Sequence, residues 1–336
     1  GMKIHESQDL RSGVPILNAI NIISEQAENA DFKKVLNGVH DILKEGESFS
    51  QALAYYPGIF FPLYIAMVRT GENSGNLPEV LLKISDYKAK EDEFISRLRM
   101  ALAYPALMGF VGVATIIFML VFVMPRLMGI FSNMEQALPI PTRILISVSD
   151  ALRKWWWAVI IAAASAAFFI RIEARTKAGR LYVSVLKLKM PVFGKLLIKA
   201  ELSRFARTLA ILVESGIPIL KAIDISIPVL ENEILKNQLS ASYKELEQGG
   251  SFGRSLKSSK VFPLFMTNLI IVGEESGKLG DALFEVANSY EKDTDEAMKI
   301  MASLLEPLMI LGMGLVVGFI VVAMLLPIFE INVMVR

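Results

Sequence analysis

The chain contains 336 residues, of which 53% are hydrophobic, and its mean hydropathy is +0.47. This composition is too apolar for an ordinary soluble domain and predicts membrane-spanning segments joined to soluble parts. The formal net charge of +1 provides no overall field for nucleic acid, and the absence of cysteine, with only His5 and His40 as histidines, excludes disulfides, thiolate nucleophiles and Cys/His zinc sites.

Residues 1–100 are predicted to form a first helical bundle. One helix within it carries apolar residues at helical spacing on a single face, namely Phe32, Val35, Leu36, Val39, Ile42 and Leu43. Gly13 followed by Pro15 indicates the end of one helix and the start of the next, because glycine tolerates a left-handed cap and proline suits a first helical turn. No alternating pattern supports β-strands.

Residues 104–125 are predicted to cross a membrane. No residue from Met100 to Pro125 is ionisable, and residues 106–124 alone are long enough to cross about 30 Å of hydrocarbon at about 1.5 Å per residue. The segment that follows, residues 126–153, is expected to form a loop on the far side of that membrane.

A second crossing is predicted at residues 154–171, because no charge lies between Lys154 and Arg171. The uncharged stretch is short for a span, so we expect these two side chains to extend to the interfaces. The tryptophans at residues 155–157 indicate an aromatic belt at one end. A buried helix of a soluble domain is the alternative interpretation.

A second helical bundle is predicted at residues 172–303. Its helices have apolar faces formed by Phe205, Leu209 and Leu212, by Leu235, Leu239 and Leu246, and by Leu279, Leu283, Val286 and Tyr290. A third crossing is predicted at residues 304–328, followed by a tail at residues 329–336. Gly314 and Gly318 have the spacing that lets helix backbones approach closely in lipid.

Lysine and arginine are concentrated between Arg171 and Arg207 and before the first crossing, whereas the segment after it and the C-terminal tail carry fewer. The positive-inside rule therefore places both bundles on the cytoplasmic face, with the 126–153 loop and the tail outside. Binding of anionic lipid headgroups is the alternative explanation for the basic run.

An internal repeat organises the chain, since motifs in the first half recur about 200 residues later. The pairs are Ser12–Leu17 with Ser215–Leu220, Gly46–Phe49 with Gly249–Phe252, Phe61–Leu63 with Phe262–Leu264, and Gly71–Leu77 with Gly273–Leu279. Pro105 and Pro125 bracket the first crossing as Pro307 and Pro327 bracket the last. Each repeat is therefore predicted to combine one soluble bundle with one span.

The paired motifs Ser-Gly-x-Pro-Ile-Leu, Phe-Pro-Leu and Gly-Glu-x-Ser-Gly-x-Leu, each followed by a proline-bounded span, resemble the type II secretion system protein F family. The resemblance implies an all-α polytopic membrane protein with two repeated cytoplasmic helical bundles and three transmembrane helices in a bacterial inner membrane. It also implies a non-enzymatic platform whose partners are a cytoplasmic hexameric assembly ATPase, other inner-membrane assembly proteins, pilin or pseudopilin subunits, membrane lipid and further copies of the chain.

The chain departs from the family pattern at its start. In the second copy a helix at Ala200–Glu214 precedes the Ser-Gly-x-Pro motif, whereas only residues 1–11 precede it in the first copy. The first bundle is therefore predicted to be truncated at its N-terminus. This departure places in doubt any contact with the ATPase that a longer N-terminal segment makes.

No catalytic residue and no cofactor are predicted. The glycine-rich segment Gly249–Gly253 lacks the lysine of a phosphate-binding loop, so nucleotide hydrolysis must come from a partner. The repeated turns provide the candidate partner-binding residues Gly71, Glu72, Gly75, Gly273, Glu274 and Gly277.

Two interpretations of these turns remain open. In the structural one, each glycine permits a tight turn and each carboxylate caps the next helix. In the functional one, Glu72 and Glu274, together with Asp281, gather a hard cation or face a basic patch on the ATPase.

The alternative function is a small transporter or channel that works as an oligomer, because repeats in membrane proteins often form a substrate pathway. No predicted span carries an ionisable residue near its centre, which argues against such a pathway.

Overall fold

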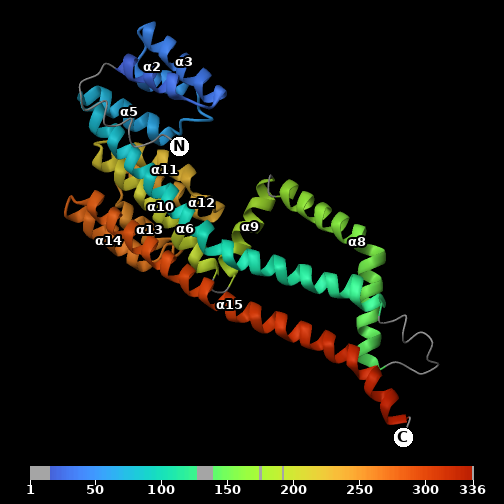
Figure 1. The fold of residues 1–336 in the computed structure, drawn as a ribbon. Coiled ribbons are helices and arrows are strands. Elements are labelled where there is room, and N and C mark those ends of the chain that lie inside the picture. Colours follow the sequence, from blue (N-terminus) through green and yellow to red (C-terminus); the bar gives the residue numbers. More distant parts are fainter. Residues whose placement is uncertain (1–15, 127–138, 174–175, 191–192, 335–336) are drawn as a thin grey trace. The chain divides into compact units, whose positions relative to one another are not determined.

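The computed structural model describes residues 16–126, 139–173, 176–190 and 193–334. Every regular element in these ranges is a helix, so the prediction of an all-α fold is confirmed for them (Figure 1). The predicted turn at Gly13 and Pro15 lies outside the described residues.

The first half of the chain forms short helices that lead into a long one. They are α2 (Ile16–Gln26), α3 (Ala30–Lys44), α4 (Phe49–Ala54), α5 (Pro62–Ser74) and α6 (Leu77–Phe118), and a π-helix, η1 (Met119–Val123), follows α6 directly. Helix α3 buries Leu36 and Val39 of its predicted apolar face.

The second half follows the same order after two connecting helices, α8 (Ile140–Glu173) and α9 (Lys177–Lys189). Its elements are α10 (Phe193–Glu214), α11 (Ile219–Ser226), the 3-10 helix η2 (Ile227–Val229), α12 (Glu233–Glu247), α13 (Phe252–Ser258), α14 (Leu264–Glu275) and α15 (Leu279–Met334).

Corresponding helices in the two halves begin with the same caps. The Asn29 side chain accepts hydrogen bonds from the backbone N–H groups of residues 31 and 32 at the start of α3, and Asn232 does the same for residues 234 and 235 at the start of α12. Ser48 and Ser251 cap α4 and α13 in the same way. Such caps satisfy amides that have no partner within the helix.

The chain divides into two compact units. The first unit combines residues 1–95 with 180–295, and the second combines residues 96–179 with 296–336. In the first unit, one continuous apolar cluster includes buried residues from both halves of the sequence, such as Met67, Phe205 and Met266. The two halves therefore share a single core.

Helix α10 is held in this core by its apolar face and by polar contacts on both flanks. Phe205, Leu209 and Leu212, which the sequence placed on one face, are fully buried. The other contacts join α10 to α15 and α6. They are Ser203 Oγ to the Ala287 carbonyl (2.8 Å), Arg207 Nη2 to Glu291 Oε2 (2.6 Å) and Thr208 Oγ1 with the Tyr87 hydroxyl (3.3 Å).

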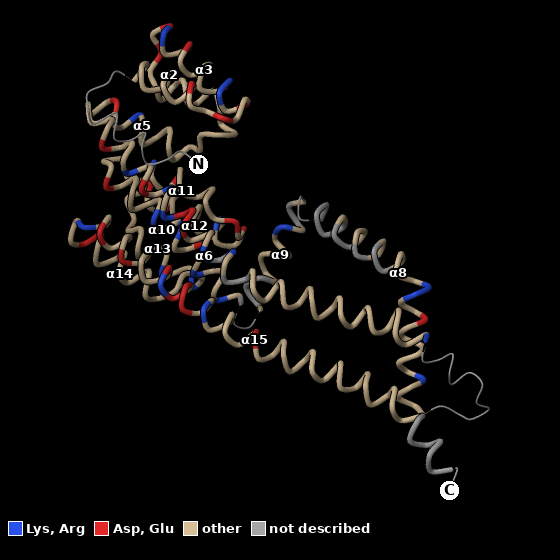
Figure 2. Tube along the Cα trace, viewed as in Figure 1, with Lys and Arg blue, Asp and Glu red and all other residues tan. Residues whose placement is uncertain are grey.

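In the second unit, the apolar stretches of α6 and α15 lie side by side, and Figure 2 shows them without charged residues along most of their length. The Tyr104 hydroxyl donates to Glu306 Oε1 (3.3 Å), and a Cβ added at Gly112 would overlap the side chain of Met313. Among the described residues, no atom of another residue lies within 4 Å of a Cβ built at Gly314 or Gly318. The close approach of α6 and α15 therefore lies at Gly109 and Gly112 of α6, which face Met309 and Met313, and not at the two glycines of α15.

Two described helical stretches, Ala103–Arg126 and Leu279–Pro327, are long and apolar enough to cross a membrane. The crossing predicted at residues 154–171 is helical within α8 but is not one of these stretches, so it stays a prediction. The segment expected to form a loop is helical from Ile140 onward, because a proline at the second helical position, Pro141, suits the start of α8.

Candidate functional site

The two glutamates of the repeated turn are bound to backbone amides. Glu72, near the end of α5, accepts hydrogen bonds from the N–H groups of Phe49 (2.5 Å) and Ser50 (3.1 Å) at the start of α4. Glu274, near the end of α14, accepts from the N–H groups of Phe252 (3.0 Å) and Gly253 (3.0 Å) at the start of α13. Each carboxylate neutralises the positive end of a short helix and satisfies its free amides.

This arrangement corrects one detail of the structural interpretation. The sequence placed each glutamate as a cap of the next helix, but each one caps a helix that precedes it by more than twenty residues. The reason is tertiary, because α5 packs on α4, and α14 on α13, with the end of the later helix beside the start of the earlier one.

The glycines of the same turns have steric roles. A Cβ at Gly273 would lie 2.5 Å from the Ala282 Cβ, and a Cβ at Gly71 would lie 3.0 Å from the Val80 side chain, so both positions permit close helix contact. Gly75 and Gly277 adopt the left-handed conformation, with φ of 70° and 71°, that ends each helix and turns the chain.

The described residues do not form a metal site at the position predicted from Glu72, Glu274 and Asp281. Among the described residues, no group of three or more Asp, Glu or His side chains is placed to hold a metal ion. Asp281 lies exposed in the first turn of α15, where an acidic side chain favours the helix dipole. The cation and partner roles of these residues therefore stay predictions.

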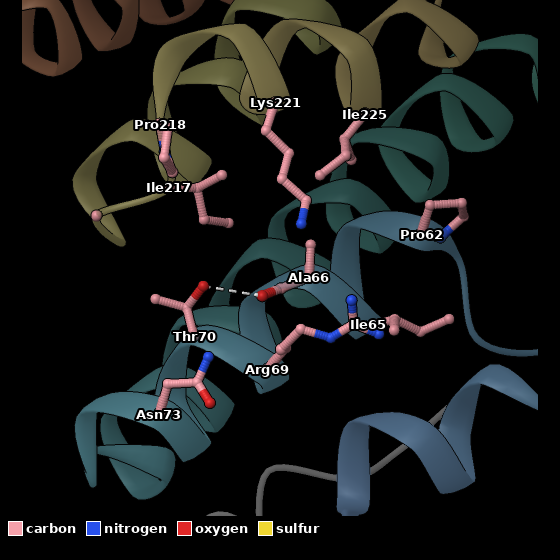
Figure 3. A pocket seen from close by; sticks show the side chains of 11 residues that line it. Pro62, Ile65, Ala66, Arg69, Thr70, Asn73, Ile217, Pro218, Lys221 and Ile225 are labelled. Carbon is pink, nitrogen blue, oxygen red and sulfur yellow. Dashed lines mark hydrogen bonds between the residues drawn. The ribbon is translucent and has the colours of Figure 1, made fainter.

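A groove of about 460 Å³ lies between α5 and α11, which come from opposite halves of the sequence (Figure 3). Apolar side chains form much of its lining. These residues are Pro62, Ile65, Ala66, Ile217, Pro218 and Ile225. Gly216 and Pro218, both from the repeated Ser-Gly-x-Pro motif, also line it, so a motif of the second repeat meets a helix of the first.

Two cations, Arg69 and Lys221, line this groove, and Figure 3 shows both charged ends turned toward the space between the helices. No acidic residue is among the described residues that line it. Thr70 and Asn73 add polar groups, although the Thr70 hydroxyl already donates to the Ala66 carbonyl (3.0 Å). Such a surface suits an acidic segment that also carries an apolar side chain.

Sequence reasoning missed Arg69 and Lys221. Each lies directly beside a recognised motif, since Arg69 is two residues before Gly71 and Lys221 follows Leu220. The motifs were visible in the sequence, but nothing in it indicated that cations from the two halves line the same groove.

A charged cluster on α6 lies close to the half-buried side chain of Tyr64 on α5. Lys88 contacts Glu91 (2.7 Å) and Asp92 (3.2 Å), and the hydrogen bond to Glu91 raises the pKa of Lys88. Burial, with a smaller contribution from the charge of Glu91, raises the pKa of Tyr64 to about 12. The tyrosine is therefore neutral wherever the protein is folded near neutral pH.

The described residues thus define a helical protein, with one unit around its own apolar core and two helices long and apolar enough to cross a membrane. The chain belongs to the family described as type II secretion system (T2SS), protein F, whose model matches it twice, at residues 10–125 and 205–327. The double match supports the internal repeat.

Curated relatives cover almost the whole chain. It is 36% identical to the type IV pilus assembly protein PilC of Thermus thermophilus, over 96% of this chain and 79% of the relative. It is 32% identical to the type II secretion system protein F of Vibrio cholerae, over 96% of this chain and 80% of the relative. It is 31% identical to PilC of Pseudomonas aeruginosa, over 96% and 86%.

Proposed function

We propose that this chain is a non-enzymatic platform protein in a bacterial inner membrane, part of a type IV pilus or type II secretion assembly machine. The family match in both halves carries this proposal. Its partners in the proposal are a cytoplasmic hexameric assembly ATPase, other inner-membrane assembly proteins, pilin-like subunits, lipid and further copies of the chain. The first unit and the C-terminal tail lie on opposite faces of that membrane, the unit cytoplasmic and the tail periplasmic.

The proposed action is mechanical coupling. The ATPase displaces the first unit, and the spans help to insert or extract pilin-like subunits. Helices α6 and α15 support this, because each continues from the first unit into an apolar stretch as one helix, with Pro105 and Pro307 inside them. A stiff helix transmits displacement along its axis better than a loop does.

The groove between α5 and α11 is the proposed docking surface for an acidic segment of the ATPase. Arg69 and Lys221 supply the complementary charge, and they lie on helices from the two halves, so a bound segment bears on both at once. Neither cation forms an ion pair with another described residue, so both remain available to a partner.

Co-purification tests the function and the surface separately. The affinity-tagged chain, purified from its own bacterium, is expected to retain the assembly ATPase, and it is expected to give no solute uptake in vesicles. Uptake without any retained ATPase would favour a transporter and contradict the platform role.

For the surface, we expect the double variant Arg69→Glu/Lys221→Glu to lower the retained ATPase by about tenfold, as loss of close charge pairs does at protein interfaces. The matched control is Lys33→Glu/Lys44→Glu, which reverses two exposed cations on α3, away from the groove. Equal amounts of ATPase retained by the two double variants would show that the ATPase does not dock in this groove. That result would not contradict the platform role.

A further inference from the structure

Pro105 and Pro307 lie early in the apolar stretches of α6 and α15, and a second matching pair of prolines interrupts the hydrogen bonding near the far ends. Pro125 follows the π-helix η1, and Pro327 lies inside α15. Proline has no amide hydrogen, so the carbonyl that would receive it is left without a donor. Inside a membrane or between packed helices such a carbonyl must find another partner.

In α15 the deprived carbonyl belongs to Ala323, four residues before Pro327. This carbonyl accepts a hydrogen bond from Thr142 Oγ1 at 2.6 Å. Ala323 is completely buried and Thr142 is 1% exposed, so no solvent competes for either group.

At Pro125 the carbonyl left without a donor lies five residues earlier, instead of four as in α15, because the preceding turn is a π-helix. The π-helix bonds each amide to the carbonyl five residues earlier, as Met124 N–H does to Met119, so Pro125 deprives Leu120. The Leu120 carbonyl accepts a hydrogen bond from Ser149 Oγ at 2.5 Å, and Ser149 is completely buried. Proline also clashes with the carbonyl four residues before it, which gives a physical reason for the π-helix at this place.

Both hydroxyls come from one face of α8. Thr142 and Ser149 are seven residues apart, or about two helical turns, with the buried Leu145 between them. Leu145 belongs to a small apolar cluster with Leu120, Met124, Ile320 and Ala323. Figure 1 shows the first turns of α8 crossing the ends of the apolar stretches of α6 and α15.

We propose that residues 140–152 of α8 form a hydroxyl strap, in which Ser149 and Thr142 replace the amide donors missing at Pro125 and Pro327. The strap holds both proline-bearing helix ends in one register. Moving α8 away removes both donors together, so the strap ties the conformations of the two helix ends to each other. This inference concerns the second unit alone and does not rest on the proposed function.

A double-mutant cycle tests the strap on the full chain in detergent. Ser149→Ala is expected to lower the midpoint of thermal unfolding by about 2–4 °C, because it leaves a buried carbonyl unpaired. In a Pro125→Ala background the alanine amide supplies the donor, so the same Ser149→Ala change is expected to cost less than half as much. Thr142→Val and Pro327→Ala form the equivalent cycle for α15.

Two further variants separate the strap from general packing effects. Thr142→Ser keeps a hydroxyl and is expected to lose less stability than Thr142→Val, which has none. Ser147→Ala is the matched control, since that exposed hydroxyl donates to the Arg143 carbonyl within α8. Equal losses for Ser149→Ala with and without Pro125, or no loss in either background, would overturn the proposal.

A distance measurement covers the case in which the variants are too unstable for melting curves. The chain has no cysteine, so spin labels at Ile144→Cys and Val322→Cys, both exposed positions, report only on α8 and α15. We expect one narrow distance distribution in the labelled protein and a broader one after Thr142→Val/Ser149→Ala. An unchanged distribution in the double variant would contradict the strap.

Discussion

Glu72 and Glu274 act as helix caps supplied from a distance. Each carboxylate lies where two or more backbone N–H groups converge at the start of a short helix, and Glu274 also accepts a hydrogen bond from Ser251 Oγ (2.7 Å). Helices as short as α4 and α13 are not stable alone, so they depend on such contacts. A charged acceptor bonds these amides more strongly than a neutral one does.

Neutralising a capping glutamate is expected to destabilise the first unit. Glu274→Gln keeps the size of the side chain and removes its charge, so we expect a loss of about 1–2 kcal/mol in the free energy of unfolding. The control is Glu275→Gln, whose exposed carboxylate pairs with the exposed Arg254 and contributes little. Thermal unfolding of the purified variants compares the two, and equal losses would contradict the capping role.

The raised pKa of Tyr64 predicts that the folded protein loses stability at alkaline pH. Its pKa is raised to about 12 when folded, against about 10 for an unfolded tyrosine, so its contribution is complete below pH 10 and falls as the pH rises toward 12. Tyr64→Phe has no hydroxyl to ionise and is expected to lose less stability over that range. Tyr55→Phe, at a side chain that is 67% exposed, is the control. Parallel pH profiles for wild type and Tyr64→Phe would refute this prediction.

At the scale of elements, most helices were predictable because their causes are local. Apolar spacing placed the buried faces of α3, α10 and α12, and the Gly-x-Pro signal placed the start of α11. The bounds of α8 were not predictable in the same way. Residues 126–153 were expected to form a loop, but Leu145 and Ser149 are buried against two other helices, and residues 140–153 are helical.

The close contact between α14 and α15 predicts a severe effect at Gly273. Gly273→Ala places a methyl group 2.5 Å from the Ala282 Cβ, which forces the two helices apart, and we expect a loss of about 1–3 kcal/mol. Ala282→Gly makes space for that methyl group. The double variant is therefore expected to lose less stability than the sum of the two single variants in thermal unfolding. Strict additivity would show that the two residues do not meet.

At the scale of the whole molecule, the two halves of the sequence form one compact unit with a shared core. Residues 1–95 and 180–295 share this core, so these two parts lie on the same face of any membrane that the chain spans. This constraint agrees with the proposed topology, in which residues 1–95 and 180–295 are both cytoplasmic, and it makes that topology testable.

Single cysteines at exposed positions test this topology, since the chain has none of its own. We expect Lys33→Cys in the first half and Lys244→Cys in the second to react with a membrane-impermeant maleimide in inverted vesicles and not in right-side-out ones. Arg143→Cys, in the segment predicted to be periplasmic, is expected to show the reverse. Labelling of Lys33→Cys and Lys244→Cys from opposite faces would contradict a shared cytoplasmic unit.

The sequence alone determined the helical class, the internal repeat, two of the apolar stretches and the family, because periodicity, caps and motif spacing act over a few residues. Only the tertiary structure decided which atoms meet. It joined Glu72 to the start of α4, brought Arg69 and Lys221 to one groove, and set the hydroxyls of α8 against the carbonyls freed by Pro125 and Pro327. These contacts link residues far apart along the chain, so no local pattern records them.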